Sequence, residues 1–348
     1  MSGTKRVGVL LLNLGTPDSP SVSDVRRYLR EFLSDPRVID IPALFRWLLL
    51  RLFVLPFRPR RSARAYRSIW TTDGSPLLVH SRALRNAVAE SLGGDYVVRL
   101  GMRYGSPSIE KAQEELIVEG VDSIIAFPLF PQFAESSTGS AVRKVLDLAM
   151  RPGHLPALVT LSPFYDHPGF IAAVAEVMRE DLVGFTPDHV VVSFHGLPER
   201  QVRRSDPHGT HCLVVDNCCA AVGPANRDCY RAHCFATARA LAEALELSRD
   251  LYTVSFQSRF GRTPWIGPPT DRVLQTLAFR GVRRVAVVCP SFVADCLETL
   301  EEIGIRGRET FRAAGGQDLR LVRSINAHPR WVAAVVARIR AVAERRGP

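Results

Sequence analysis

The residues best able to do chemistry are cysteines, and five of the seven lie within one 23-residue stretch. These five are Cys212, Cys218, Cys219, Cys229 and Cys234. The apolar run after Arg6 ends at Asn13 without a small-residue cleavage site, so it predicts a first strand and not a signal peptide. We therefore expect a cytoplasmic protein, and in a reducing compartment clustered thiols hold metal more often than they form disulfides.

A second group of candidate residues combines a histidine with carboxylates. His195 ends the apolar run 189–195, while Asp295, Glu298 and Glu302 recur at spacings of three and four, which predicts one face of a helix. A neutral imidazole can accept a proton or bind a divalent ion, and a carboxylate can relay protons. Strand-end histidines are more often structural, and carboxylate ladders are usually solvated faces. From the residues alone, the chemical and the structural interpretation are evenly matched.

Composition excludes several classes of protein. The chain has 348 residues, enough for about two domains, and 46% of them are hydrophobic, which excludes a disordered chain. The chain has 45 Lys and Arg residues against 35 Asp and Glu. This excess of positive charge is small for a nucleic-acid-binding protein, and it favours anionic small molecules or lipid as partners. The sequence contains no glycine-rich phosphate-binding motif and no GxSxG turn, so neither a nucleotide cofactor nor a serine nucleophile is indicated.

Short apolar runs alternate with amphipathic segments, a pattern that predicts an α/β fold with buried parallel strands. The runs are residues 7–13, 123–130, 189–195, 251–257 and 284–292, and the clearest helical patterns are 108–120 and 231–247. Each half has a strand ending in a turn and a later strand running through proline into a helix. We therefore expect two similar doubly wound lobes, residues 1–165 and 166–348, with ligands at the carboxyl ends of the strands.

Residues 41–64 form a separate apolar and basic segment. Arg46 and Arg51 interrupt a run of Leu, Phe and Trp, and four more arginines follow it. No window of the chain reaches 18 uninterrupted apolar residues, so no spanning helix is expected. The segment fits a peripheral contact with an anionic membrane surface, or equally a core helix followed by a basic loop.

Seven blocks spread over nearly the whole chain resemble the ferrochelatases, which insert ferrous iron into a porphyrin in the last stages of haem biosynthesis. In family order they are LLNLGTPDSPSVSDVRRYLREFLSDPRVIDIP, YRSIWTTDGSPL, GMRYGSPSIEKA, FPQFAESSTGSA, SFHGLPER, FQSRFGRTPW and PSFVADCLETLEEI. The resemblance implies two flavodoxin-like, Rossmann-like lobes of the chelatase type with the porphyrin held between them, which agrees with the strand pattern. It also implies that the apolar lip at about 43–57 faces the membrane.

The resemblance assigns residues to catalysis and to porphyrin binding. Metallation removes two pyrrole protons and drives a cation into a stiff planar ring, so the site needs a base. His195 matches the family histidine that serves as base or metal contact, and Glu298 matches the second active-site group. The positions that resemble the porphyrin lining are Leu14, Tyr66, Arg103, Tyr104, Ser137, Thr138 and Ser140. Arg103 is a candidate partner for a propionate, whereas Leu14 cannot coordinate iron.

The cysteine-rich segment, residues 208–234, is longer than in minimal members of the family. The expected ligands are Cys212, Cys219, Cys229 and Cys234. Four thiolates suit a [2Fe-2S] cluster or a structural zinc, and the spacing does not choose between them. Many ferrochelatases carry a [2Fe-2S] cluster, in some bacteria within an internal segment like this one, so the resemblance favours a cluster with a structural or sensory role. Cys218 can replace Cys219, and nearby histidines can substitute.

Several functions stay open. Iron insertion into protoporphyrin IX, giving protohaem, is favoured by the likeness of the FQSRFGRTPW and ADCLETLEEI blocks to members that use this porphyrin. Coproporphyrin III is the alternative substrate. A non-catalytic tetrapyrrole-binding protein is a different class, and cobalt insertion into a sirohydrochlorin-type ring is less favoured. We expect porphyrin and Fe²⁺ as partners, a peripheral contact with the inner membrane and no nucleic acid, while the C-terminal helix allows a monomer or a homodimer.

Overall fold

Two parallel sheets with helices on both faces make up the computed structural model, which describes residues 6–151, 156–261 and 263–345. The chain divides into two compact units. The first unit comprises Met1–Phe130, Glu135–Pro163 and Asn326–Pro348 within those described ranges, and the second comprises Pro131–Ala134 and Phe164–Ile325. Arg262, in the FQSRFGRTPW block, lies outside the described residues.

Both sheets have four parallel strands in the same order. The first sheet has the order β2-β1-β3-β4, formed by β1 (Val7–Thr16), β2 (Tyr96–Gly105), β3 (Ser123–Pro128) and β4 (Ala157–Thr160). The second has the order β6-β5-β7-β8, formed by β5 (His189–His195), β6 (Tyr252–Gln257), β7 (Arg284–Val288) and β8 (Asp318–Leu321). This order is the start of the flavodoxin-like arrangement, so the predicted fold class is confirmed.

The central strands are buried on both faces, which explains their continuous apolar sequence. Residues 9–12 of β1 are all fully buried, and Val9 pairs with Val98 of β2 and Ile125 of β3. In the second sheet, Val191 of β5 pairs with Thr253 of β6 and Val287 of β7. A strand that is covered on both faces is apolar throughout, whereas a strand with one exposed face alternates apolar and polar residues.

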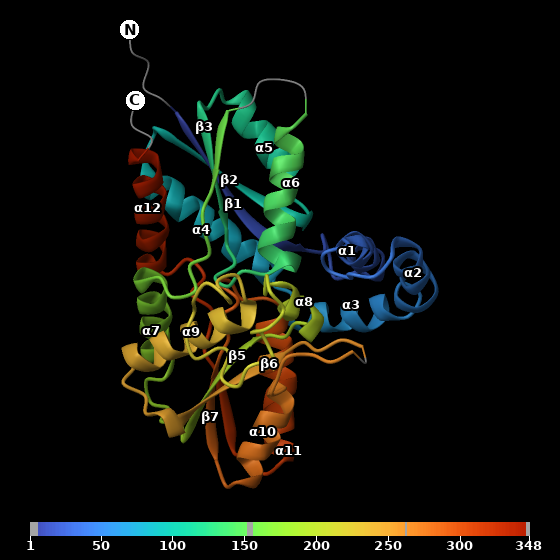
Figure 1. Cartoon of the computed structure of the whole chain (residues 1–348), viewed down its shortest axis with the longest axis vertical. Coiled ribbons are helices and arrows are strands. Elements are labelled where there is room, and N and C mark those ends of the chain that lie inside the picture. Colours follow the sequence, from blue (N-terminus) through green and yellow to red (C-terminus); the bar gives the residue numbers. More distant parts are fainter. Residues whose placement is uncertain (1–5, 152–155, 262, 346–348) are drawn as a thin grey trace. The chain divides into compact units, whose positions relative to one another are not determined.

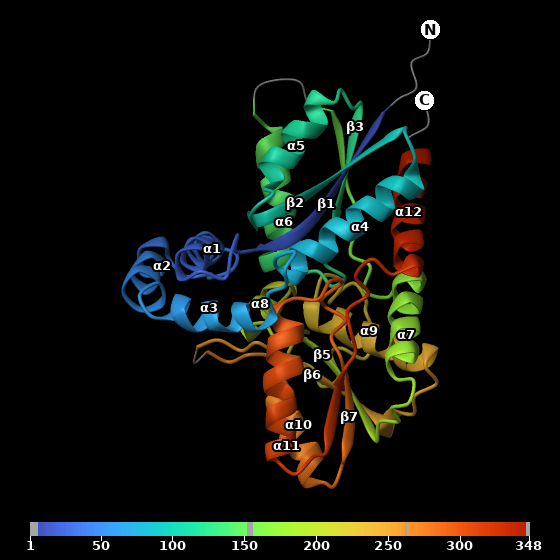
Figure 2. The ribbon, with the colours of Figure 1, turned by 180° about the vertical axis from the view of Figure 1, so that it is seen from behind.

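Helices cover both faces of the first sheet. The helices of the first unit are α1 (Val22–Ser34), α2 (Ala43–Leu48), α3 (Arg58–Ile69), α4 (Pro76–Leu92), α5 (Ile109–Val118), α6 (Ser140–Ala149) and α12 (Pro329–Glu344), with π-helical turns η1 (Leu49–Val54) and η2 (Glu135–Gly139), and α2 and α3 extend away from the sheet. Figures 1 and 2 show α5 and α6 on one face and α4 and α12 on the other. The sheet and the first pair share a core around Leu10, Leu116 and Val145.

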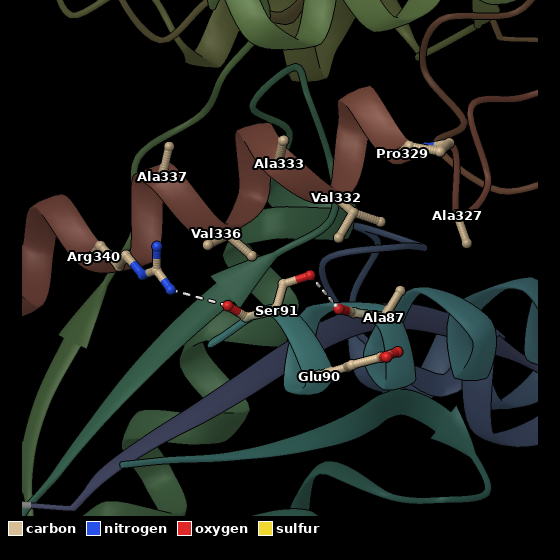
Figure 3. Close-up of a pocket in the computed structure, with 10 residues that line it drawn as sticks. All are labelled: Ala87, Glu90, Ser91, Ala327, Pro329, Val332, Ala333, Val336, Ala337 and Arg340. Carbon is tan, nitrogen blue, oxygen red and sulfur yellow. Dashed lines mark hydrogen bonds between the residues drawn. The ribbon is translucent and has the colours of Figure 1, made fainter. Parts of the chain in front are cut away.

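The C-terminal helix α12, expected in the second lobe, belongs to the first unit. It packs along α4, where Val332 and Val336 face Ala87 and Arg340 donates to the carbonyl oxygen of Ser91 at 2.9 Å (Figure 3). The same helix sends a buried tryptophan against a phenylalanine of β3. Its apolar face is therefore covered within its own unit.

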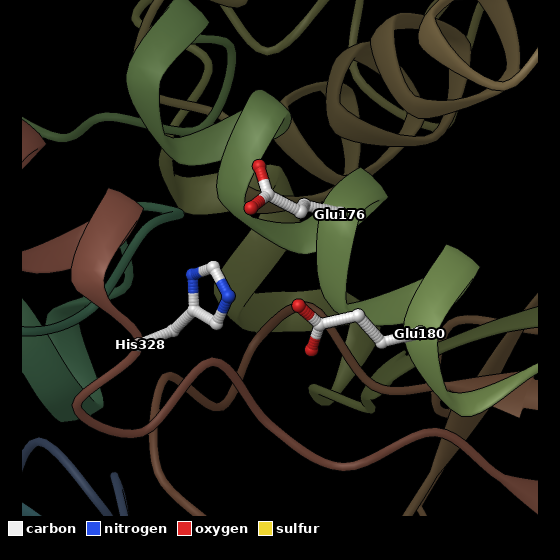
Figure 4. A group of neighbouring side chains, drawn as sticks. All are labelled: Glu176, Glu180 and His328. Atoms are coloured by element: carbon white, nitrogen blue, oxygen red, sulfur yellow. The ribbon is translucent and has the colours of Figure 1, made fainter.

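The second sheet is covered in the same way, by α10 and α11 on one face and by α7 and α9 on the other (Figure 1). The helices are α7 (Pro168–Asp181), α8 (Glu199–Arg204), α9 (Tyr230–Ala244), α10 (Thr270–Phe279) and α11 (Arg308–Ala313), with the 3₁₀ turn η3 (Arg249–Leu251) and the π-helix η4 (Glu298–Gly307). Glu176 and Glu180 lie one turn apart on α7 (Figure 4). Glu180 pairs with Arg323. His328, of the first unit, caps α12.

Candidate functional site

His195 is the last residue of β5, at the carboxyl end of the second sheet. The chain order reverses between β5 and β7, and such a switch point opens a crevice outside the strand ends. Phe292, which follows β7, lies next to His195 with ring centroids 6.3 Å apart. The sheet therefore places His195 where open parallel sheets bind their ligands.

The orientation of the His195 ring defines the state of its two nitrogens. Nδ1 lies 2.6 Å from the carbonyl oxygen of Gly196. Because a carbonyl oxygen can only accept, Nδ1 carries the hydrogen of this bond, and in the neutral ring Nε2 keeps its lone pair. Nε2 is thus the atom that can accept a proton or contact a divalent cation.

Glu298 and Glu302 on η4 form a carboxylate pair near His195. The charges of Glu298 and His195 both act on Glu302. Burial raises the pKa of Glu302, although its two oxygens accept hydrogen bonds from the N–H of Ser258 at 2.8 Å and from its hydroxyl at 2.6 Å. A carboxyl group with a raised pKa exchanges its proton closer to neutral pH, which suits a proton relay.

Asp295, expected on the same helical face as the two glutamates, lies outside that helix. The helix η4 begins at Glu298 and is a π-helix, with i to i+5 hydrogen bonds in place of the α-helical i to i+4. Asp295 Oδ1 accepts hydrogen bonds from the hydroxyl of Thr299 and the N–H of Ser324, both at 3.1 Å. Its role is to hold the turn before η4, and it does not extend the carboxylate pair.

Gln257, the last residue of β6, ties η4 to the sheet. Its Nε2 donates to the carbonyl oxygen of Glu298 at 2.7 Å. Its Oε1 accepts from the hydroxyl of Ser193 at 2.7 Å and from the thiol of Cys289 at 3.5 Å. The sequence predicts the strand end at Gln257, but no local pattern indicates a contact with a residue 41 positions away.

In the first unit, Arg103, Tyr104 and Ser140 converge on the buried carboxylate of Asp35. Asp35 Oδ2 accepts hydrogen bonds from Arg103 Nη2 at 2.6 Å, from the hydroxyl of Tyr104 at 2.9 Å and from that of Ser140 at 2.5 Å. The guanidinium of Arg103 also stacks on the Tyr104 ring, 4.5 Å from its centroid. Asp35, which the sequence analysis missed, therefore holds three residues of the expected porphyrin lining in one arrangement.

Replacing Asp35 by asparagine should destabilise the protein at neutral pH and have a smaller effect in acid. Burial opposes ionisation of Asp35, but hydrogen bonds from Ser140, from the Arg37 N–H and from Tyr104, with the charge of Arg103, lower its pKa. The stability that Asp35 contributes is therefore present above its unfolded pKa and is lost as the pH falls. We expect a loss of about 2–4 kcal/mol at pH 7 by urea unfolding, because one buried partner of an ion pair is removed.

The matched control for this prediction is Asp18→Asn, which removes an exposed ion pair with Arg27 and should change stability by less than about 0.5 kcal/mol. As the pH falls below about 4 the gap between wild type and Asp35→Asn should narrow, because the unfolded chain binds a proton at this aspartate there, and it should close once the folded carboxyl, with its lowered pKa, is protonated too. A gap of the same size at pH 3 and pH 7 would contradict the assigned role of the charge.

The remaining expected lining residues also lie in the first unit. Leu14 is half-buried at the end of β1, and Tyr66 is buried on α3 with its ring 6.1 Å from that of Trp70. Ser137 and Thr138 lie on η2. The hydroxyl of Thr138 is buried and has no hydrogen-bond partner among the described residues. Buried hydroxyls are usually hydrogen-bonded, so this one is available to a polar group of a bound ligand.

The apolar lip is a helical projection whose large side chains are exposed. Six of them, on or next to α2 and η1, are between 53% and 72% exposed, namely Leu44, Phe45, Trp47, Leu52, Phe53 and Phe57. The exposed Arg60, Arg61 and Arg64 follow on α3. This arrangement does not match the core helix that was one of the two expectations. Among the described residues, no helix is both long and apolar enough to cross a bilayer.

Three of the four expected cysteine ligands meet in the second unit. The thiol of Cys229 is hydrogen-bonded to those of Cys219 and Cys212. Cys218 Sγ lies 3.8 Å from Cys219 Sγ. The sulfurs of Cys212, Cys229, Cys219 and Cys218 therefore follow one another as neighbours.

The fourth expected ligand, Cys234, faces a different partner. It is buried on α9 and is hydrogen-bonded to the hydroxyl of Tyr230, although the charge of Cys229 also acts on it. Of the neighbouring histidines, His233 is fully engaged, because Nδ1 accepts from the Phe133 N–H at 3.2 Å and Nε2 is bonded to the Arg227 carbonyl at 2.7 Å. Cys218 is thus better placed than His233 to complete the set.

Within the segment the hydrogen bonds of Cys229 favour its thiolate, whereas burial raises the pKa of Cys212, and the hydrogen bond with Cys229 together with burial raises that of Cys219. The hydrogen bond from Cys219, followed by those from the Ala232 N–H and Cys212, lowers the pKa of Cys229 to about 6 in spite of burial. Arg231 Nη1 donates to the sulfur of Cys219 at 3.1 Å. Thiolates are the form in which cysteine binds metals, so the donor set fits a metal cluster.

Comparisons with known proteins agree with the geometry. The sequence model of the family described as Ferrochelatase matches residues 6–343. The chain is 47% identical over 335 residues to the "Ferrochelatase" of Coxiella burnetii (strain Dugway 5J108-111), covering 96% of this chain and 93% of that one. It is 45% identical over 332 residues to the "Ferrochelatase" of Legionella pneumophila (strain Paris), covering 95% and 97%.

Two solved structures share the fold. The sirohydrochlorin chelatase SirB from Bacillus subtilis subspecies spizizenii, in complex with cobalt, matches with a TM-score of 0.56 at 13% identity, covering 98% of this chain and 97% of that one. SirB from Bacillus subtilis with Fe³⁺ matches with a TM-score of 0.52 at 14% identity, covering 98% of each chain. At this identity the likeness shows the chelatase architecture alone.

Proposed function

Because the chain belongs to the ferrochelatase family, a family of metal chelatases that use Fe²⁺ as substrate, we propose that its porphyrin is protoporphyrin IX and its product protohaem. The observation that carries the mechanism is the orientation of His195, whose Nδ1 is bonded to the Gly196 carbonyl and whose Nε2 retains a lone pair. A pyrrole N–H must lose its proton before iron can bind, and Nε2 is the atom that accepts it.

The carboxylate pair carries the proton onward. Glu302 has a raised pKa, and its charge interacts with both His195 and Glu298. A proton taken up at His195 can therefore pass to a carboxyl group that holds a proton at higher pH than an ordinary glutamate does. Glu298 steadies the cation as it exchanges water for pyrrole nitrogens, since carboxylate oxygens are suitable ligands for a hydrated divalent ion.

The charge of the proposed lining favours the porphyrin with fewer propionates. Coproporphyrin III carries two more carboxylates than protoporphyrin IX, so it needs additional cationic contacts. Among the seven lining positions Arg103 is the single cation, and it already pairs with the buried carboxylate of Asp35. This lining supports a two-propionate substrate.

Anaerobic incubation of the purified protein with Fe²⁺ and each porphyrin tests the proposal, with the product followed by absorption. We expect protohaem formation with a kcat/KM at least about tenfold above that for coproporphyrin III, because unpaired carboxylates in a pocket are costly. Equal or reversed rates would contradict the choice of porphyrin. Tight binding of both porphyrins without metallation would favour the tetrapyrrole-binding alternative.

We further propose that the cysteine-rich segment holds a [2Fe-2S] cluster, with Cys212, Cys219 and Cys229 as ligands and Cys234 or Cys218 as the fourth. Four cysteine ligands suit such a cluster. The resemblance to family members that carry a cluster in an internal cysteine-rich segment supports it over a structural zinc. The cluster would supply a structural or sensory group, since metallation involves no net redox change.

The lip is proposed to rest on the surface of an anionic membrane, which would give access to a poorly soluble macrocycle.

The double variant Phe45→Ser and Phe53→Ser should weaken binding to phosphatidylglycerol-containing vesicles about tenfold or more, because two large exposed apolar side chains are lost. Cosedimentation measures the bound fraction. Phe279→Ser, at a phenylalanine on α10 that is more exposed than either, is the control and should bind like wild type. Equal binding by all three proteins would contradict the proposal.

A further inference from the structure

The hydroxyl of Tyr230 joins three elements around the proposed base. Tyr230 is the first residue of α9 and is buried. Its hydroxyl donates to the carbonyl oxygen of His195, at the end of β5, at 2.8 Å. The same hydroxyl lies 3.0 Å from the hydroxyl of Ser291, which follows β7. The Tyr230 hydroxyl thus connects α9 to the chain at the end of β5 and to the chain after β7, the two strands between which the strand order reverses.

The peptide group between His195 and Gly196 is held at both of its polar atoms. Its carbonyl oxygen accepts from Tyr230 at 2.8 Å, and its N–H, on Gly196, donates to the carbonyl oxygen of Gln257 at 2.7 Å. A Cβ on Gly196 would come within 2.8 Å of that same Gln257 oxygen, so the backbones approach too closely for a side chain. The orientation of this peptide group is therefore fixed by two hydrogen bonds.

The imidazole of His195 depends on this peptide group. Nδ1 is bonded to the carbonyl oxygen of Gly196, the residue on the far side of the held peptide. A rotation of the peptide would move both the Cα of His195 and the acceptor of Nδ1, and would swing Nε2 away from its position. A displacement of about 1 Å in a reacting group can cost up to about a hundredfold in rate.

The phenol also contacts the cysteine-rich segment. Tyr230 follows Cys229, the N-cap of α9, and its hydroxyl is hydrogen-bonded to Cys234 one turn further along the helix. The residue that bonds to the main chain of His195 is therefore itself held by the cysteine-rich segment, through its peptide bond to Cys229 and its hydrogen bond with Cys234. The sequence gives no sign of this link, since Tyr230 and His195 are 35 residues apart.

We propose that Tyr230 is a positioning residue, whose hydroxyl fixes the main chain of His195 and thereby aims Nε2 at the pyrrole nitrogens. The inference rests on the proposed function, because it matters to catalysis only if His195 accepts the pyrrole proton. Tyr230→Phe removes the hydroxyl and leaves the ring in place.

Tyr230→Phe should lower kcat about tenfold while the KM for the porphyrin stays within about twofold of wild type, because orientation of the base is lost but the porphyrin contacts are kept. The matched control is Tyr252→Phe, a buried tyrosine at the start of β6, at the opposite end of the strand from Gln257. It should leave both constants unchanged. An unchanged kcat in Tyr230→Phe, or an equal loss in both variants, would overturn the inference.

A second measurement does not depend on activity. In ¹⁵N-histidine-labelled protein as purified, without added Fe²⁺ or porphyrin, the ring signals assigned to His195 by their loss in His195→Ala should shift in Tyr230→Phe and stay in place in Tyr252→Phe. Unshifted signals in Tyr230→Phe would overturn the positioning role. If the wild type forms no metalloporphyrin while these signals do shift, the proposed function fails and the positioning role stands.

Discussion

Replacing His195 by alanine should lower kcat about 10²- to 10⁴-fold, the range expected when a general base is removed. Deprotonation of the ring must precede iron binding, and the Nδ1 bond to Gly196 leaves Nε2 as the acceptor on this residue. The loss should appear in kcat and not in porphyrin affinity, because the proposed lining residues lie on β1, α3, β2, η2 and α6 and are unchanged. Steady-state rates with Fe²⁺ and protoporphyrin IX, together with porphyrin binding by fluorescence quenching, separate the two effects.

His189→Ala is the matched control, since His189 is the first residue of the same strand β5. Six residues of strand separate the two histidines by about 20 Å, so His189 lies at the amino end of the sheet, away from the switch point. Its ring is bonded to the hydroxyl of Thr253 at 2.8 Å, and its loss should affect stability without affecting kcat. A His195→Ala protein that retains more than about a tenth of wild-type kcat would contradict the role of His195 as base.

The strands that are buried on both faces could be predicted, because such burial requires a continuous apolar run in the sequence. Five apolar runs each correspond to a strand, and β5 begins and ends where its run does. Three strands were missed for physical reasons. β2 carries arginines at 99 and 103 that interrupt its apolar pattern, and β4 and β8 are four-residue strands at the sheet edges, largely half-buried and too short to show a period.

The sequence suggests candidate site residues but not the contacts between them. His195 and Glu298 are predicted from the resemblance of their motifs to the family, and the structure adds that Glu298 begins a π-helix held by Gln257. Hydrogen bonds such as those of Asp35 and Tyr230 join residues between 35 and 105 positions apart. No local periodicity encodes such contacts, because they depend on how the strands are ordered in the sheet.

Replacing Cys229 by alanine should abolish the visible absorption of the freshly prepared protein and reduce its iron and acid-labile sulfide to near zero. Cys229 is hydrogen-bonded to both Cys219 and Cys212, so it is the centre of the group. It also has the lowered pKa that favours thiolate at neutral pH. Since binding of the metal centre contributes to folding, the thermal unfolding midpoint should fall by several degrees as well.

Cys289→Ala is the matched control, because Cys289 is a buried thiol of the same unit outside the segment, near Gln257. It should keep full iron, sulfide and absorption. Comparison of Cys218→Ala with Cys234→Ala then identifies the fourth ligand, as the variant that loses the cluster. The 3.8 Å separation of the Cys218 and Cys219 sulfurs favours Cys218, whereas the bond of Cys234 to the Tyr230 hydroxyl already occupies that thiol. Wild-type protein that contains stoichiometric zinc and no iron would contradict the cluster altogether, and iron retained by Cys229→Ala would remove Cys229 from the ligand set.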